Sequence, residues 1–363
     1  MFGISHFLSL IYLLFHPFTL RLIGFLTLTY TLTRIVTALL IYTRSSTITR
    51  YVHGTLNSYV LITGATSPLG VALADELSHH GFNIILQGHD VDALDSVQKR
   101  MTMKYPRRHY KVLVADALSD SNADYDKLID PIRNLNITVL INALSSSTST
   151  PRLTPHPIKP FHETPHSELS DMLDVNVRFT MHFTRALLPV LLKNEPACVM
   201  NVGSHLGHSE APYLAAYGAS KGWLKTWSRG LAVEMKDGEG RDVDVVYFVV
   251  AETLIDNEGH EQAGSGWMSW LTPSADVMAK AMVHTVGCGD WSVTPYVWHL
   301  ALGVVAMLPN RWHRRFVLGV TKPRVGKEVS MSRGSEQVKA EVEHALGTAR
   351  NGDAATMNQK KEA

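Results

Sequence analysis

Cysteine is scarce in this chain: Cys198 and Cys288 are the only two, and neither belongs to a C-x-x-C pair or to a Cys/His cluster at metal-ligand spacing. A disulfide framework is therefore excluded, and free thiols in a reducing compartment are the expectation. The scattered histidines favour surface and loop positions, so no metal site is predicted. A net charge of only +1 lacks the basic field that attracts nucleic acid, so no nucleic-acid partner is expected.

Charge is also missing from the N-terminal part of the chain. No acidic residue precedes Asp75, no lysine precedes Lys99, and residues 2–20 carry no formal charge. A run of that length crosses a hydrocarbon core of about 30 Å as a helix. It has neither the basic n-region nor the A-x-A site of a cleaved signal peptide, so we expect an uncleaved membrane anchor. The charges that follow are all arginines, which predicts that this side is cytosolic: Arg21, Arg34, Arg44 and Arg50.

Two further hydrophobic stretches flank the rest of the chain. Residues 22–43 are interrupted by Arg34 and are compatible with a second span, a re-entrant hairpin or an interfacial helix. Residues 296–320 are broken at Pro309 and are too short to predict a span. We expect an interfacial helix there, with a core or dimer helix as the alternative. The side chains expected at headgroup level are Trp298, Trp312, Arg311, Arg314 and Arg315.

Between these segments, short apolar runs alternate with helical periodicity. The expected strands are 59–64, 83–88, 109–116, 137–143, 197–204 and 243–250, with one more near 291–295. The expected helices are 68–81, 92–105, 168–193 and 217–236. Strands that alternate with helices of this length form βαβ units around a parallel sheet. The predicted fold class is therefore α/β, with a Rossmann-type, doubly wound parallel sheet of about seven strands.

The strongest chemical signal is YGASK at residues 217–221. Tyr217 and Lys221 are four residues apart, which places them on one face of a helix. A free phenol is a weak acid near neutral pH, and an ammonium one turn away favours its phenolate form. Ser204 ends an upstream strand, where its hydroxyl can hydrogen-bond a substrate carbonyl. Chance is a poor explanation for this set, because a glycine-rich loop also lies far upstream.

These motifs resemble those of the short-chain dehydrogenase/reductase superfamily, from about Tyr59 to Thr253. The elements that match in order are TGATSPLG at 63–70, Asn176 in DVNVRF, Ser204, and the pair Tyr217 and Lys221. Within the superfamily the chain is most similar to the membrane-bound very-long-chain 3-oxoacyl-CoA reductases and the 17β-hydroxysteroid dehydrogenases. That closer likeness lies in HGFNIILQG, ITVLIN, YFVVAETL and TPYVWHLALGVVAMLP.

The resemblance implies a role for each matching residue. Tyr217 would be the catalytic acid/base, and Lys221 would assist it and bind the nicotinamide ribose. Ser204 would orient the substrate carbonyl, and Asn176 would support the proton relay. The resemblance also implies an NADPH/NADP+ site formed by Gly64, Ser67, Leu69, Gly70, His89, Asp116, Asp124, Asn142, Tyr217, Lys221, Val250 and Thr253.

Four of these cofactor residues have more specific expected contacts. Asp116 is expected near the adenine, with Asp124 as a second candidate in the same region. The backbone of Val250 is expected at the nicotinamide carboxamide. Thr253 is expected on the pyrophosphate side.

The glycine loop departs from the family pattern at Pro68, which replaces its middle glycine. Proline suits the first position of a helix, where its missing N–H would be unpaired anyway, and Ser67 before it suits an N-cap. Gly64 and Gly70 are both kept. We therefore expect the loop to bind phosphate with one donor fewer.

Two other departures bear on the adenosine half of the site. NALS at 142–145 replaces N-N-A-G, which keeps Asn142 and weakens the expected adenine-ribose contact. No acid stands at Gln87 or Gly88 to bind a ribose 2′-hydroxyl, and His89 occupies the place of an arginine that binds a 2′-phosphate in the close relatives. The sequence therefore favours NADPH over NADH.

The expected organisation has four parts: a membrane anchor at 1–50, a short-chain dehydrogenase/reductase domain at 51–290, a hydrophobic interfacial segment at 291–325 and a polar tail at 326–363. The substrate pocket is expected from the loops at 145–167 and 254–275, the second as a lid. The chain ends in Lys360, Lys361, Glu362 and Ala363, the K-K-x-x form of an endoplasmic reticulum retrieval signal.

The leading hypothesis is an NADPH-dependent ketoreductase on the cytosolic face of the endoplasmic reticulum membrane. Its substrate would be a lipid-like ketone, either a 3-oxoacyl chain, a steroid, or a polyketide or terpenoid intermediate. The alternative is a non-catalytic, membrane-tethered scaffold that retains the fold, motivated by Pro68 and by residues 143–145. The intact set of Asn176, Ser204, Tyr217 and Lys221 argues against a scaffold. The resemblance also implies a possible homodimer through the helix that bears Tyr217.

Overall fold

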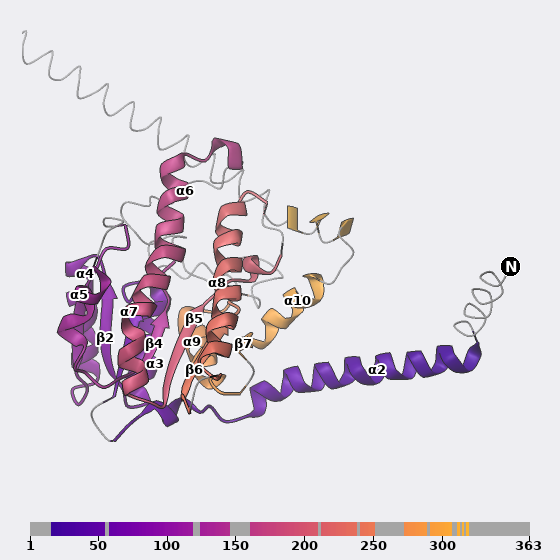
Figure 1. Cartoon of the computed structure of the whole chain (residues 1–363), viewed down its shortest axis with the longest axis horizontal. Coiled ribbons are helices and arrows are strands. Elements are labelled where there is room, and N and C mark those ends of the chain that lie inside the picture. The colour runs from indigo at the N-terminus through magenta and orange to yellow at the C-terminus, as the bar shows by residue number, and fades with distance from the viewer. Residues whose placement is uncertain are drawn as a thin grey trace, which may run out of the picture.

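A seven-stranded parallel sheet forms the centre of the computed structural model (Figure 1). The structure describes residues 16–54, 58–118, 124–145, 160–209, 212–237, 240–250, 272–288 and 291–306, with parts of 311–318. The strands are β1 (Tyr59–Thr63), β2 (Asn83–Gly88), β3 (Tyr110–Val114), β4 (Ile137–Asn142), β5 (Ala197–Val202), β6 (Val243–Phe248) and β7 (Ser292–Val293). Their order, β3-β2-β1-β4-β5-β6-β7, confirms the doubly wound fold, including the expected last strand.

Helices cover both faces of the sheet and account for its two large buried clusters. One cluster receives Leu73, Leu94 and Met278 from α3 (Pro68–His79), α4 (Val91–Lys104) and α9 (Ala275–His284). The other receives Ile129 and Leu187 from α5 (Tyr125–Ile129) and α7 (Thr180–Lys193), and it also contacts α8 (Ala215–Glu234). Because both faces are covered, the central strands β2, β4 and β5 are buried at every position.

The helix expected at 168–193 is observed as three consecutive pieces. An α-helix, α6 (His166–Leu173), passes into a π-helical segment, η5 (Asp174–Phe179), and then into α7. A π-helical turn inserts an extra residue and rotates the side chains that follow, and such turns occur frequently at functional sites. The 3-10 helices are η1 (Ile41–Thr43), η2 (Ile48–Tyr51), η3 (Asp130–Ile132), η4 (Phe161–Glu163), η6 (His205–Gly207) and η8 (Val297–His299).

The observed N-terminal helix does not match the two apolar runs, 2–20 and 22–43, that the sequence pattern separates. A single helix, α2 (Pro17–Leu40), begins within the first run and passes through Arg34 without interruption. It starts there because Pro17 occupies its first turn and the His16 side chain accepts a hydrogen bond from the Phe18 N–H at 3.3 Å. The alternative of a re-entrant hairpin at 22–43 is thereby corrected. The first expected span, residues 2–20, lies mostly outside the described part of the chain, so the number of spans stays a prediction.

Helix α2 projects away from the rest of the molecule (Figure 1), and none of its residues is buried. Within the described ranges it is the one helix, counted as Pro17–Thr43, that is long and apolar enough to cross a membrane by length and composition.

The segment after α2 belongs to the folded domain, so the boundary expected at residue 50 falls inside a packed region. Ile48 and Tyr51 are buried in the core against α3 and α9. The Tyr42 hydroxyl donates to the Thr294 carbonyl at 2.6 Å, and the Thr47 N–H donates to the Val286 carbonyl at 3.0 Å. The Tyr51 hydroxyl donates to the Asp244 carboxylate at 2.7 Å. The segment that follows α2 is therefore bound to β6 and to the residues after α9.

The hydrophobic stretch after β7 forms η8 and α10 (Leu300–Ala306) within the described residues. His299 is fully buried, while Trp298 and Trp312 are 52% and 64% exposed. Arg311, Arg314 and Arg315 are also exposed. Among the described residues of this stretch, His299 and Tyr296 fit the core alternative, whereas the exposed tryptophans and arginines fit the interfacial helix.

The tie between residues 41–51 and the end of the domain can be tested at Gly287. This residue has φ +72°, and an added Cβ would overlap the Thr47 side chain. Gly54 has a similar φ of +69° and open space around it, so Gly54→Ala carries only the backbone cost of about 1–2 kcal/mol. We expect Gly287→Ala to lower the free energy of unfolding by roughly 1–3 kcal/mol more than Gly54→Ala. Thermal unfolding in detergent measures both, and equal losses would contradict the tie.

Candidate functional site

The loop between β1 and α3 approaches its neighbours so closely that two positions accept only glycine. Gly64 has φ +66°, and a Cβ there would lie 3.0 Å from the Leu144 Cα. At Gly70 a Cβ would overlap the carbonyl oxygen of Gly64 and would lie 2.9 Å from the Ala65 Cα. The loop is therefore wound tightly against the first turn of α3, with no side chain between them.

Pro68 fits this loop as the local sequence rules predict. Ser67 is the N-cap of α3, with extended backbone angles, and its Oγ accepts a hydrogen bond from the Gly70 N–H at 3.1 Å. Pro68 is the first helical residue, where an N–H has no helical partner. The Gly70 N–H is occupied by the cap, so the Leu69 N–H is the first-turn donor that remains for an anion.

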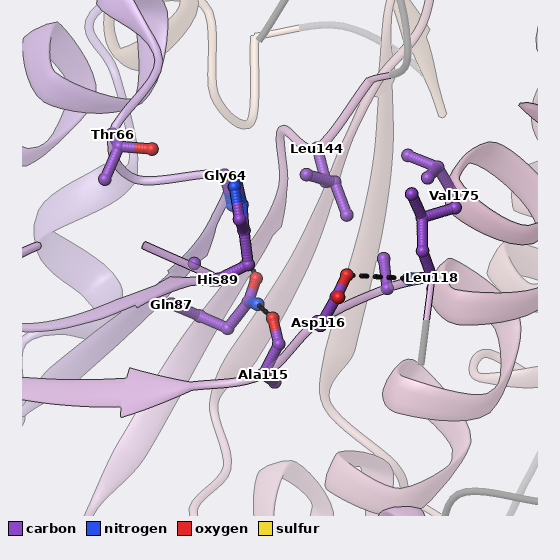
Figure 2. Close-up of a pocket in the computed structure, with 11 residues that line it drawn as sticks. Gly64, Thr66, Gln87, His89, Ala115, Asp116, Leu118, Leu144 and Val175 are labelled. Atoms are coloured by element: carbon purple, nitrogen blue, oxygen red, sulfur yellow. Dashed lines mark hydrogen bonds between the residues drawn. The ribbon is translucent and has the colours of Figure 1, made fainter. Parts of the chain in front are cut away.

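A pocket opens beside this loop at the carboxyl ends of the strands (Figure 2). Its lining combines the glycine loop, the ends of β2 and β3, the residues after β4 and one residue of η5. These residues are Gly64, Thr66, Gln87, Gly88, His89, Ala115, Asp116, Ala117, Leu118, Leu144 and Val175. Ligands of doubly wound sheets bind at this edge, where the strand order reverses beside β1.

Gln87 is a lining residue that sequence reasoning noted only as the absence of an acid. Its side-chain amide donates to the Ala115 carbonyl at 2.8 Å, and its Oε1 accepts from the Gly64 N–H at 3.3 Å (Figure 2). Gln87 therefore links the glycine loop to the end of β3. The sequence feature that could have indicated this role is a polar residue that follows the apolar run of β2.

Buried polar atoms without partners show what kind of group the pocket fits. Among the described residues, His89 Nε2, Ser145 Oγ and Asn142 Oδ1 are buried and make no hydrogen bond. Buried polar groups are almost always paired, and of these three residues His89 lines the pocket, so its unpaired Nε2 favours a polar ligand there. The Asp116 carboxylate accepts from the Leu118 N–H at 2.9 Å and faces the same pocket (Figure 2). Together with the tight glycine loop, these groups fit the adenosine and phosphate half of a dinucleotide.

Asn142 and Asp124 are not among the residues that line the pocket. The Asn142 amide donates to Thr184 Oγ1 at 3.0 Å and to Asn201 Oδ1 at 2.8 Å, which connects β4 to β5 and α7. Asp124 is exposed, caps α5 through the Lys127 N–H at 3.2 Å and pairs with the Lys127 ammonium at 3.0 Å. Asn142 therefore stabilises the packing of β4 against its neighbours, and Asp124 stabilises the start of α5. Thr253 and most of the two expected pocket loops lie outside the described residues.

Ser204 lies just after β5 with 9% of its surface exposed. Its Oγ accepts from the Leu206 N–H at 3.2 Å, so its own proton is left to be donated elsewhere. Val250, expected at the nicotinamide, lies beside it, because the His205 N–H donates to the Val250 carbonyl at 3.0 Å. The ends of β5 and β6 therefore meet at one place.

Helix α8 brings Tyr217 and Lys221 to the same place. Lys221 is only 3% exposed, and its Nζ donates to the Val202 carbonyl at 3.2 Å. The same ammonium lies 5.8 Å from the centre of the half-buried Tyr217 ring. The ammonium and the phenol ring are therefore held side by side on α8. A phenol beside a cation and a serine with a free proton can together protonate and hold a carbonyl oxygen.

Asn176 reaches this group from η5. Its amide donates to Ser220 Oγ at 3.0 Å, and Ser220 Oγ donates to the Tyr217 carbonyl at 2.7 Å. Ser220 was missed by sequence reasoning, although it lies within YGASK, because nothing in the sequence places Asn176 against it. The structure therefore brings together all four of the expected catalytic residues.

Two histidines after Ser204, His205 and His208, were also missed. Burial lowers the pKa of His205, and hydrogen bonds to backbone groups, including that of His299, oppose this effect. Burial also lowers the pKa of His208, and the nearby Lys225 lowers it further. Both imidazoles are therefore neutral at physiological pH, so they add no positive charge near Lys221.

Comparison with known proteins agrees with this geometry. The family model of the short chain dehydrogenases matches residues 58–261. A very-long-chain 3-oxoacyl-CoA reductase of Neurospora crassa is 31% identical over 203 residues, which span 56% of this chain and 59% of that relative. The match thus covers less than two thirds of the relative's own length.

Solved structures give the same fold. A 7β-hydroxysteroid dehydrogenase structure has a TM-score of 0.60 at 18% identity and covers 72% of this chain and 97% of its own. A short chain dehydrogenase from Shigella flexneri, complexed with NADP, has a TM-score of 0.55 at 20% identity and covers 66% and 95%. From the family match over 58–261, the sheet order and the site geometry, we conclude that the chain belongs to the short-chain dehydrogenase/reductase family of NAD(P)(H)-dependent oxidoreductases.

Proposed function

We propose that this protein is a membrane-bound, NADPH-dependent ketoreductase that reduces the ketone of a lipid-like substrate. The substrate would be a 3-oxoacyl-CoA, a steroid or a secondary-metabolite intermediate. The observation that carries the proposal is the convergence of Tyr217, Lys221 and Ser204 in a fold whose neighbouring pocket fits the adenosine and phosphate half of a dinucleotide.

The nicotinamide of the bound cofactor would supply a hydride to the carbonyl carbon. Tyr217 would donate its proton to the carbonyl oxygen as charge develops there, and Ser204 would donate a hydrogen bond to the same oxygen. The Lys221 ammonium would stabilise the phenolate left on Tyr217. Asn176 would hold α8 through Ser220 and connect the tyrosine to its source of protons.

The end of β2 supports a preference for NADPH. Gln87 makes a backbone contact through each end of its side-chain amide, and the first carboxylate after β2, Asp90, caps α4 by accepting from the Ala93 N–H at 3.0 Å. Neither side chain is therefore placed to pair with the two hydroxyls of an adenine ribose. His89 Nε2 is buried at the pocket without a partner and would donate to a 2′-phosphate.

The proposed membrane location rests on α2 and on the surface after β7. Helix α2 has the length and composition of a span and buries none of its apolar side chains. Exposed tryptophans and arginines on and after η8 fit the headgroup level of the same bilayer. Together these features support the proposal of a catalytic domain on the cytosolic face of the endoplasmic reticulum membrane. A protein held there meets substrates that partition into lipid.

The cofactor preference can be tested by titrating the detergent-solubilised protein with NADPH and NADH, with energy transfer from tryptophan as the signal. We expect NADPH to bind at least about 10-fold more tightly than NADH, because one charge-assisted hydrogen bond is worth about 1.5–3 kcal/mol. His89→Asp should remove or reverse this preference through repulsion of the 2′-phosphate. His109→Asp, the same change at an exposed position outside the pocket lining, should leave it unchanged. Tighter binding of NADH by the unaltered protein would refute the preference.

The acid role can be tested with Tyr217→Phe, which removes only the hydroxyl. Turnover of a reducible ketone should fall by about 10²–10⁴-fold, the usual contribution of a general acid, while NADPH affinity changes little. Tyr105→Phe, at the C-terminal end of α4, serves as a matched control and should retain full turnover. Unchanged turnover in Tyr217→Phe would exclude the tyrosine as the acid. A wild-type protein that binds cofactor and reduces no ketone would favour the scaffold.

A further inference from the structure

Tyr247 in β6 and Gly203 after β5 occupy the same small space. Tyr247 is completely buried, and a Cβ added at Gly203 would fall within its phenol ring. Gly203 does not have a left-handed backbone, so backbone conformation does not explain why it is a glycine. The close approach of the ring does, and the two residues are therefore a matched pair beneath the catalytic residues.

The Tyr247 hydroxyl contacts the backbone of both Ser204 and Lys221. It lies 3.4 Å from the Ser204 N–H nitrogen, from which it accepts, and it lies 3.5 Å from the Ser204 carbonyl and 3.4 Å from the Lys221 carbonyl. The N–H groups on either side of Ser204 donate instead to β6, at the carbonyls of Phe248 and Val250. The backbone of Ser204 is thus held by a side chain at the point where β5 ends.

The rest of the Tyr247 environment keeps the ring and its proton in place. Leu224 and Val249 pack against it, and the Trp291 ring lies 6.5 Å away. The His208 ring lies 5.8 Å from it, and His208 Nδ1 lies 3.4 Å from the Ser204 carbonyl. Burial raises the pKa of Tyr247 to about 12, and the neighbouring Tyr217 adds to this rise. The hydroxyl therefore stays neutral near pH 7 and can donate and accept at once.

We propose that Tyr247 is a positioning residue of the reductase reaction. By joining the backbone of Ser204 to that of Lys221, its hydroxyl fixes the end of β5 against α8. The distance between the serine hydroxyl and the Tyr217 hydroxyl depends on that separation, and both must reach one carbonyl oxygen. This role rests on the proposed function. Because Tyr247 is completely buried, it acts through the two residues that it joins.

Tyr247→Phe tests the proposal because it keeps the ring and removes the joining hydroxyl. We expect kcat to fall about 2- to 10-fold, since a hydrogen bond contributes about 0.5–1.5 kcal/mol, while KM for NADPH stays within about 2-fold. The matched control is Tyr51→Phe, which also removes a buried hydroxyl, one bonded to Asp244 near the amino end of β6 and away from Ser204 and Lys221. It should lower the melting temperature to a similar extent and leave kcat unchanged.

Amide hydrogen exchange of the same variants provides a readout that does not depend on turnover. Peptides that contain residues 203–208 and 217–224 should exchange several-fold faster in Tyr247→Phe than in the wild type and Tyr51→Phe, because Ser204 has lost its partner. Exchange that matches Tyr51→Phe in these peptides, or an unchanged kcat in an active enzyme, would overturn the proposal. If the wild type reduces no ketone, the proposed function fails, and the exchange result still decides whether Tyr247 holds the two elements together.

Discussion

The buried ammonium of Lys221 is the constraint on which the catalytic end of the molecule depends. A charge with only 3% of its residue surface exposed is unfavourable unless polar groups surround it, and here the Val202 carbonyl accepts from it at 3.2 Å. The Tyr217 ring provides the other nearby surface, with its centre 5.8 Å from the same nitrogen. Such an arrangement is a poor way to gain stability, because an apolar residue would pack there without desolvation cost. In the proposed reaction the ammonium would stabilise the negative charge left on Tyr217, and that role would account for its burial.

Contacts between distant parts of the sequence hold the elements around Lys221 and the neighbouring pocket in place. Ser220 links η5 to α8, the Tyr247 hydroxyl links β6 to both α8 and the end of β5, and Gln87 holds the glycine loop at the neighbouring pocket. Each of these is a buried polar group satisfied by backbone or side-chain partners. Such networks favour one arrangement of the site over others, because any displacement leaves buried polar atoms unpaired.

Hydrophobic patterns and helix-capping rules predicted those parts of the fold that depend on residues close together in the sequence. The sequence predicted β2 at its observed bounds, and it predicted Ser67 as the cap that makes Pro68 harmless. Each of these depends on residues within one turn or one strand. The same kind of rule should have given Asp124 its observed place, because an aspartate three residues before a helical N–H is a cap signal.

Contacts between distant segments could not be predicted in this way. The fit of Tyr247 against Gly203 joins two strands, and neither residue carries a signal for the other. The π-helical turn at Asp174–Phe179 and the passage of α2 through Arg34 likewise have no local sequence mark. In the candidate site the chemistry-bearing residues were predictable from their motif. The residues that hold them in place were not, since they depend on tertiary packing.

Hydride transfer from the nicotinamide ring to a carbonyl carbon is the central claim, and isotope transfer tests it most directly. The purified protein would be incubated with NADPH deuterated at the transferred position of C4 and with a long-chain 3-oxoacyl-CoA or a steroid ketone. Mass spectrometry should find one deuterium at the carbinol carbon of the alcohol formed. Oxidation of the cofactor without deuterium in any alcohol, or no oxidation by a protein shown to bind NADPH, would contradict the claim.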